Sequence, residues 1–200
     1  MIKIIDNLLS PSYADNILND AVHALQYFYS KETARPAGGE QLFKDENTID
    51  YGQFACPIVV SPEEPAPAFG FYMNLIRPLI YTAIDRAPEI EIHGIVRIKF
   101  NLLLQQKDAP EFHYNIPHKD AKDSAYSMVY YCNDSDGDTF LFNEFYQHGR
   151  LPTKLTIAER VTPKKNRAVI FESHRYHASS NPRINKDRMI INFVFHASKR

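Results

Sequence analysis

The stretch HKDAKDSAYSMVYYCNDSDGDTFLFNEF (residues 118–145) decides the fold, because it holds two strand-like runs joined by a turn. SAYSMVYYCN (124–133) and DTFLFNEF (138–145) are rich in the aromatic and β-branched residues that favour strands. NDSDGD (133–138) has the composition of a tight turn. The stretch therefore predicts two consecutive strands, preceded by the polar tripeptide His118-Lys119-Asp120.

Similar runs flank this stretch on both sides and are separated by further turn clusters. They are IEIHGIVRIKFNLLL (90–104), KLTIAERV (154–161), RAVIF (167–171) and RMIINFVFHA (188–197). Six or more short strands in succession predict a β-sandwich or barrel. We therefore expect a mainly β fold over the C-terminal half of the chain.

The N-terminal part has a different pattern. Ser10-Pro11 is a helix start, and apolar residues recur at helical spacing from Ala14 to Phe28. A second helix is expected over about 67–86, with a kink or new start at Pro78. We expect one domain over 1–200, with a helical support and loop region at 1–88 and the β-strand core at 89–200.

The bulk composition excludes several function classes. The chain has 200 residues and a net charge of −1, which does not favour a nucleic-acid or membrane-surface protein. No run reaches the roughly 18 apolar residues of a membrane span. Two cysteines give no disulfide framework, so a reducing, intracellular and cytoplasmic location is expected. Oligomeric state is not indicated by these numbers.

A metal site is suggested by His118 and Asp120. In an extended segment residues i and i+2 point the same way, so both side chains can bind one ion from one side. FESHRYHASSNP (171–182) offers His174 and His177 as a third ligand. Two imidazoles and one carboxylate suit Fe(II) or Mn(II) better than a structural zinc. The alternative is a loop histidine beside a solvated aspartate, which the tripeptide alone does not exclude.

An anion-binding residue is suggested by Arg188, which stands at the head of an apolar strand run. Arginine binds carboxylates in a bidentate manner, so Arg188 could hold the far end of a dicarboxylate cosubstrate. The hydroxyl of Tyr131 could contact the same group. The alternatives are a solvated strand end for Arg188 and an ordinary core or edge position for Tyr131.

These pieces together resemble the Fe(II)/2-oxoglutarate-dependent oxygenases of the prolyl 4-hydroxylase-like group, over residues from about 95 to 196. Small phage and bacterial members are the most similar, which fits an intracellular, phage-encoded protein. The pieces that carry the resemblance occur in the order typical of the group. They are RIKFNL, HKD, VYYCN, GDTFLF, TPKKNRAVIF, HASSNP and RMIINFVF.

The resemblance implies a double-stranded β-helix, or jelly-roll, buttressed by helices. It implies iron bound by His118, Asp120 and His177, with 2-oxoglutarate and O2 as cosubstrates. It assigns the distal carboxylate of 2-oxoglutarate to Arg188, with Tyr131 as a helper, and Asn192 would line the same pocket. His174 is expected in a loop or beside the ligands.

The implied reaction is hydroxylation of a C–H bond, with succinate and CO2 as coproducts. The substrate is expected to be a peptide or protein, with prolyl residues favoured, or a small molecule. Segments 30–68, 107–117 and 143–154 are candidates for a substrate lid. Two departures from the group pattern are a single glycine, Gly137, and Asn166 in place of a glycine. The alternatives are a non-catalytic jelly-roll and a cupin-like metal protein that does not use 2-oxoglutarate.

Overall fold

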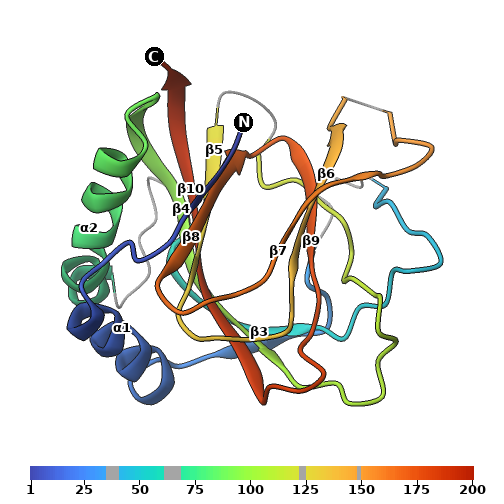
Figure 1. Ribbon diagram of the computed structural model, residues 1–200, viewed down its shortest axis with the longest axis horizontal. Coiled ribbons are helices and arrows are strands. Elements are labelled where there is room, and N and C mark those ends of the chain that lie inside the picture. Colours follow the sequence, from blue (N-terminus) through green and yellow to red (C-terminus); the bar gives the residue numbers. More distant parts are fainter. Residues whose placement is uncertain (35–40, 61–68, 122–124, 148–149) are drawn as a thin grey trace.

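The computed structural model describes residues 1–34, 41–60, 69–121, 125–147 and 150–200, with the side chains of 69–72 left out. Within these residues two antiparallel sheets face each other, as Figure 1 shows. The larger, seven-stranded sheet has the order β1 (Ile2–Ile5), β8 (Arg167–Glu172), β5 (Ala125–Tyr131), β10 (Asp187–Lys199), β4 (Ile90–Leu104), β3 (Gln53–Val59) and β2 (Phe28–Ser30). The smaller sheet has the order β7 (Ile157–Val161), β6 (Thr139–Phe145) and β9 (Arg175–Ser179).

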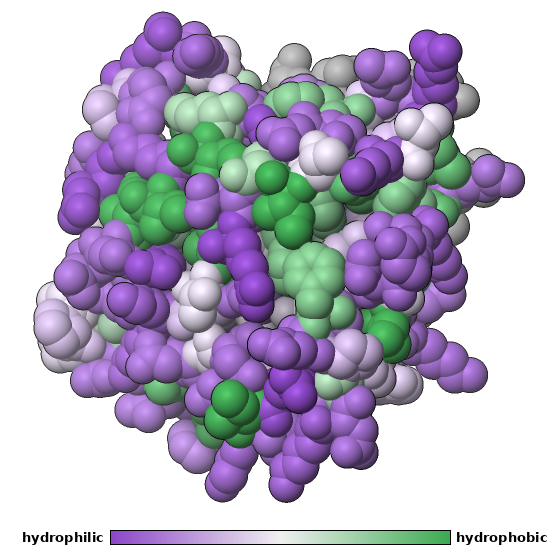
Figure 2. Space-filling view, turned by 45° about the vertical axis from the view of Figure 1, so that its right-hand side comes forward, coloured by the Kyte–Doolittle hydropathy of each residue, from purple (hydrophilic) through white to green (hydrophobic). Residues whose placement is uncertain are grey.

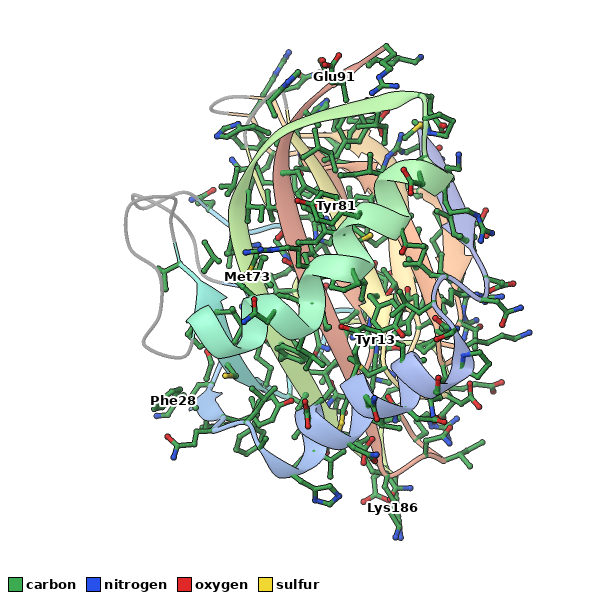
Figure 3. The ribbon with its side chains drawn as sticks, turned by 90° about the vertical axis from the view of Figure 1, so that its left-hand side faces the viewer. Tyr13, Phe28, Met73, Tyr81, Glu91 and Lys186 are labelled. Carbon is green, nitrogen blue, oxygen red and sulfur yellow. The ribbon has the colours of Figure 1, made fainter. Side chains whose placement is uncertain are left out.

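Helices α1 (Pro11–His23) and α2 (Phe69–Arg86) cover the outer face of the larger sheet. Figure 3 shows both helices lying across the strands, with Tyr13 on α1 and Tyr81 on α2. Their apolar faces form one core with the outward side chains of β4, β5 and β10. The Tyr13 hydroxyl donates to the Leu75 carbonyl at 2.5 Å and so ties α1 to α2. This is the expected mainly β fold, a double-stranded β-helix buttressed by helices.

On β4 and β10 the alternation of side chains separates an apolar face from a polar face. Ile98 and Phe100 of β4 belong to the core under the helices. Lys99 and Asn101 alternate with them and therefore point into the space between the sheets. On β10, Arg188 and Asn192 point the same way. The interior of the fold thus has a polar wall built from two adjacent strands.

The N-terminal part differs from the sequence expectation at the end of its first helix. Helix α1 ends at His23. Phe28 instead lies in β2, where it pairs with Ala55 of β3. The apolar residues keep helical spacing beyond His23, the last residue of α1. Pairing with β3 nevertheless holds Phe28 in a strand and overrides that local signal. Helix α2 continues through Pro78 without a new start.

One departure from the group pattern, Asn166 in place of a glycine, can be compared directly with the backbone. Asn166 has φ of 66°, the left-handed conformation that asparagine tolerates in place of glycine. Its side chain accepts from the Leu9 amide and donates to the Leu9 carbonyl, both at 2.8 Å, and so links β8 to the N-terminal segment. No helix among the described residues is long and apolar enough to cross a membrane.

Candidate metal centre and cosubstrate pocket

The structure brings His177 together with His118 and Asp120, although it lies more than 50 residues further along the chain. Each offers one ligand atom, and these three atoms lie within 4.8 Å of one another. His177 is on β9, and His118 pairs with it through two backbone hydrogen bonds of 2.9 Å. The Asp120 amide donates to the Ser173 carbonyl at 2.9 Å. Backbone hydrogen bonds to β9 and to the turn between β8 and β9 therefore fix all three positions.

The orientation of both histidines is set by their own chain segments. Nδ1 of His118 lies 3.0 Å from the Ile116 carbonyl oxygen, and Nδ1 of His177 lies 3.0 Å from the Arg175 carbonyl oxygen. A carbonyl can only accept, so each Nδ1 carries the hydrogen and each Nε2 presents a lone pair. Nε2 of His177 lies 3.4 Å from the Asp120 carboxylate. This is the tautomer that a metal-binding imidazole requires.

Asp120 is held by a network that the sequence did not reveal. Arg97 of β4 donates to Oδ1 of Asp120, and Ser127 of β5 donates to Oδ2 at 2.7 Å. Asn192 of β10 donates to the same Oδ2 at 3.3 Å and accepts from Arg97 at 3.3 Å. Three strands thus orient one carboxylate. Arg97 occupies the oxygen that does not face His177, which favours a single metal-facing oxygen on Asp120.

The electrostatics keep His118 and Asp120 in the protonation states that a metal needs. Burial and the neighbouring His177 ring lower the pKa of His118 to about 3, so this imidazole is neutral at pH 7. Burial alone would raise the pKa of Asp120, but Arg97 and His177 outweigh it and hold the pKa well below its usual range. Two imidazoles that present Nε2, beside an ionised carboxylate, form a donor set that fits Fe(II).

Arg188 is buried, with an exposed fraction of 2%, and not solvated as the alternative required. Its Nε donates to the Gly137 carbonyl and its Nη2 to Oγ1 of Thr139, both at 2.7 Å. Tyr131 donates to the same Thr139 oxygen at 2.8 Å. Among the described residues no carboxylate pairs with Arg188, and burial lowers the pKa of its guanidinium. A buried cation without a counter-ion is unfavourable, so this side chain is suited to an anionic ligand.

A small cavity of about 40 Å³ joins these groups. Its walls include the three candidate ligands, Arg188 and Thr139. Lys99 and Asn101 of β4 line it beside β10, and Thr33 and Gln53 line it as well. Burial and the nearby Arg97 lower the pKa of Lys99 to about 8, although Asp120 opposes this shift.

The remaining predicted residues lie at different distances from this centre. Asn192 lines the cavity, but its side chain contacts Asp120 and Arg97. Its cosubstrate-binding role stays a prediction. His174 lies outside the cluster, and its ring contacts that of Phe145 with centroids 4.8 Å apart. Of the lid candidates, 30–68 supplies Thr33 and Gln53 to the cavity. Its residues 35–40 and 61–68, and 148–149 of the third lid segment, lie outside the described part.

The fold and the side-chain cluster define a class: a double-stranded β-helix protein with a two-histidine, one-carboxylate site between its sheets. Residues 103–196 match the model of the 2OG-Fe(II) oxygenase superfamily, which confirms the resemblance found in the sequence. These residues therefore form a 2OG-Fe(II) oxygenase domain, and that family of enzymes uses Fe(II), 2-oxoglutarate and O2. No curated protein sequence matches the chain.

Solved structures of this class share the fold at low sequence identity. A 2OG-Fe(II) oxygenase family oxidoreductase from Burkholderia pseudomallei has TM-score 0.61 and 17% identity, covering 98% of this chain and 85% of that one. A Trichoplax adhaerens prolyl hydroxylase with a hypoxia inducible factor peptide has TM-score 0.56 and 16% identity, covering 98% and 83%. The epimerase SnoN with Fe3+, α-ketoglutarate and nogalamycin RO has TM-score 0.59 and 11% identity, covering 100% and 81%.

Proposed function

We propose that this protein is a dioxygenase that binds Fe(II) through His118, Asp120 and His177 and hydroxylates a C–H bond of an organic substrate. The observation that carries the proposal is the convergence of two correctly oriented imidazoles and one ionised carboxylate within 4.8 Å. Such a face of three protein ligands leaves the opposite positions of an octahedral ion open. With iron bound, 2-oxoglutarate and O2 would yield the hydroxylated substrate, succinate and CO2.

The chain's own residues would bind and orient the reactants. Arg188 would hold the distal carboxylate of 2-oxoglutarate, since it is a buried guanidinium on the cavity wall with no carboxylate partner in the described structure. Tyr131 and Thr139 would support it, because Thr139 accepts from both Tyr131 and Arg188. Arg97, Ser127 and Asn192 would keep Asp120 in a fixed orientation. These contacts position the reacting groups before the chemistry begins.

For the substrate we propose a peptide, with a prolyl or other residue as the target, or a small molecule. The structurally similar proteins include examples of each kind: the Trichoplax enzyme was crystallised with a peptide and SnoN with nogalamycin RO. At such low identity the likeness supports the fold and does not choose between the two.

The test is succinate formation from 2-oxoglutarate under air, with Fe(II) added to metal-free protein. We expect slow uncoupled turnover in the wild type and none in His118→Ala or Asp120→Ala, with His23→Ala as an exposed control. Equal succinate formation in wild type and Asp120→Ala would contradict the ligand assignment. Metal binding without any dependence on 2-oxoglutarate would instead favour the cupin-like alternative.

A further inference from the structure

A polar wall beside the iron position remains unused by the proposed function. Lys99 pairs with Asn192 across β4 and β10, and Asn192 contacts Asp120. Paired residues on one face of a sheet have their Cβ atoms about 5 Å apart, so Lys99 stands next to the candidate metal centre. Within the part of the chain that the structure describes, the Lys99 ammonium has no hydrogen bond and no ion pair, although it lines the cavity.

The orientation of the neighbouring amides is fixed by a chain of hydrogen bonds. Gln53 donates from Nε2 to the Thr33 carbonyl at 2.9 Å, so its Oε1 faces Asn101. Asn101 then donates from Nδ2 to that Oε1 at 2.8 Å. Oδ1 of Asn101 is consequently a buried acceptor without a partner, and so is Oγ1 of Thr33. Buried polar atoms without partners are rare and usually await a ligand or water.

The charges in the cavity favour an anion on this wall. Asp120 and the two carboxylates of 2-oxoglutarate would contribute three negative charges. Fe(II) with Arg97, Arg188 and Lys99 would contribute five positive charges, so a net charge of about +2 would remain. A neutral substrate would leave this excess in a partly buried site, which is unfavourable. Each carboxylate of a substrate would offset one unit of this excess.

We propose that Lys99, Asn101 and Thr33 form a substrate subsite that binds a carboxylate together with an adjacent N–H or O–H donor. The inference rests on the proposed function, because it places the primary substrate beside the iron. Lys99 would bind the carboxylate, while Asn101 and Thr33 would accept from the donor. The chemical class is that of an amino or hydroxy acid, either free or at an acidic or C-terminal residue of a peptide. An internal prolyl residue lacks the carboxylate.

The experiment uses the full chain with Fe(II) and 2-oxoglutarate under anaerobic conditions. The probes are the free L-amino acids and small hydroxy acids, each compared with its carboxamide. A second set contains short peptides with free acidic or C-terminal carboxylates, compared with their amidated forms. The visible band of iron-bound 2-oxoglutarate reports binding, and succinate release after O2 addition reports coupled turnover. The two probe sets distinguish a free acid from a peptide as the source of the carboxylate.

We expect at least one carboxylate probe to perturb the band and to raise succinate release, and its carboxamide to do neither. Lys99→Met should weaken the apparent affinity for that probe about tenfold or more. The same variant should leave 2-oxoglutarate affinity within about twofold, since Arg188 is intact. Lys99→Arg should restore part of the effect, and Lys199→Met, an exposed position, should behave as wild type.

Four outcomes would overturn the proposal: carboxamides acting as well as acids, no acid in either set acting, an unchanged acid response in Lys99→Met, or a large loss of 2-oxoglutarate affinity in that variant. The last would assign Lys99 to the cosubstrate. Failure of the proposed function itself gives a different result. The wild-type protein with Fe(II) and 2-oxoglutarate would then show no visible band, even with no probe added. In that case the proposed subsite would be rejected together with the proposed function.

Discussion

The surroundings of Arg188 suit its side chain to an anionic ligand. It is almost fully buried on β10, it donates to Gly137 and Thr139, and no carboxylate of the described residues neutralises it. Desolvating a guanidinium costs several kcal/mol unless an anion compensates. The side chain is therefore held in place by neutral acceptors while its charge remains available to a ligand.

Arg188→Lys is expected to weaken 2-oxoglutarate binding about tenfold or more. Lysine keeps the charge but loses the planar fork, which removes a charge-assisted hydrogen bond of roughly 1.5–3 kcal/mol. Binding is measured by anaerobic titration of the visible iron–2-oxoglutarate band, with Arg77→Lys on the exposed side of α2 as the matched control. An unchanged affinity in Arg188→Lys, with the fold intact by circular dichroism, would remove Arg188 from the cosubstrate site.

Some residues of the site could be predicted from the sequence and others were missed. His118, Asp120, His177 and Arg188 were found because they occur in short patterns with a known order. Arg97 and Lys99 were missed because they sit inside a run that reads as an apolar strand. A signal was present: Arg97, Lys99 and Asn101 alternate with Ile98, Phe100 and Leu102. Cationic and amide side chains on one face of a buried strand indicate a polar cavity.

At the scale of elements, the turn between β5 and β6 connects the two sheets and supports Arg188. The backbone of Gly137 accepts from Arg188, and a Cβ on Gly137 would lie 2.6 Å from the Ser180 carbonyl oxygen and 3.1 Å from Cδ of Arg188. A side chain here would have to displace backbone or the arginine. The single glycine of this turn is therefore required by close approach.

Gly137→Ala is expected to lower the free energy of unfolding by about 1–3 kcal/mol, as overpacking does elsewhere. It should also weaken 2-oxoglutarate binding, because Arg188 must move. Urea unfolding and the anaerobic titration measure the two effects. Gly94→Ala in β4 is the control, since a Cβ there meets no atom within 4 Å. If both variants unfold at the same urea concentration, the proposed crowding at Gly137 is wrong.

The elements were predictable where their signal was local. Strand β4 has the bounds expected from its sequence, Ile90–Leu104, and α2 ends at Arg86 as expected. Strand β9, Arg175–Ser179, was not among the strands expected from the sequence, because RYHAS has little strand character by itself. It is a strand because it pairs with β6. Such long-range pairing leaves no periodic mark in a five-residue segment.

At the scale of the whole molecule, the candidate metal centre is also a stability liability in the metal-free protein. The folded chain holds His118 neutral, with a pKa of about 3, while the unfolded chain takes up a proton near pH 6.5. Between these two values the unfolded state binds more protons. The free energy of unfolding therefore falls as the pH is lowered from about 6.5.

We expect metal-free wild type to lose on the order of 1 kcal/mol of stability per pH unit from His118 alone below pH 6.5. Urea unfolding at pH 7, 6 and 5 measures this slope. His118→Gln should flatten it, and His23→Gln, on the exposed end of α1, should not. Parallel slopes for wild type and His118→Gln would mean that His118 is not held neutral by the fold.

The division at residues 88 and 89 stays a prediction, but the first part clearly serves the second. Strands β1, β2 and β3 extend the larger sheet, and α1 and α2 bury its outer face. The surface over the smaller sheet is mostly hydrophilic with separate apolar spots, as Figure 2 shows. Thr33 and Gln53 bring the N-terminal part directly to the cavity. The substrate subsite is therefore built by both parts of the chain.

The most direct test of the account is an anaerobic titration of metal-free protein with Fe(II) and then 2-oxoglutarate. The account predicts that the visible charge-transfer band of a chelated 2-oxo acid forms in the wild type. It predicts that the band is absent in His177→Ala and present in His174→Ala, since His174 lies outside the cluster. A band that survives in His177→Ala, or Fe(II) binding with no band in the wild type, would contradict the account.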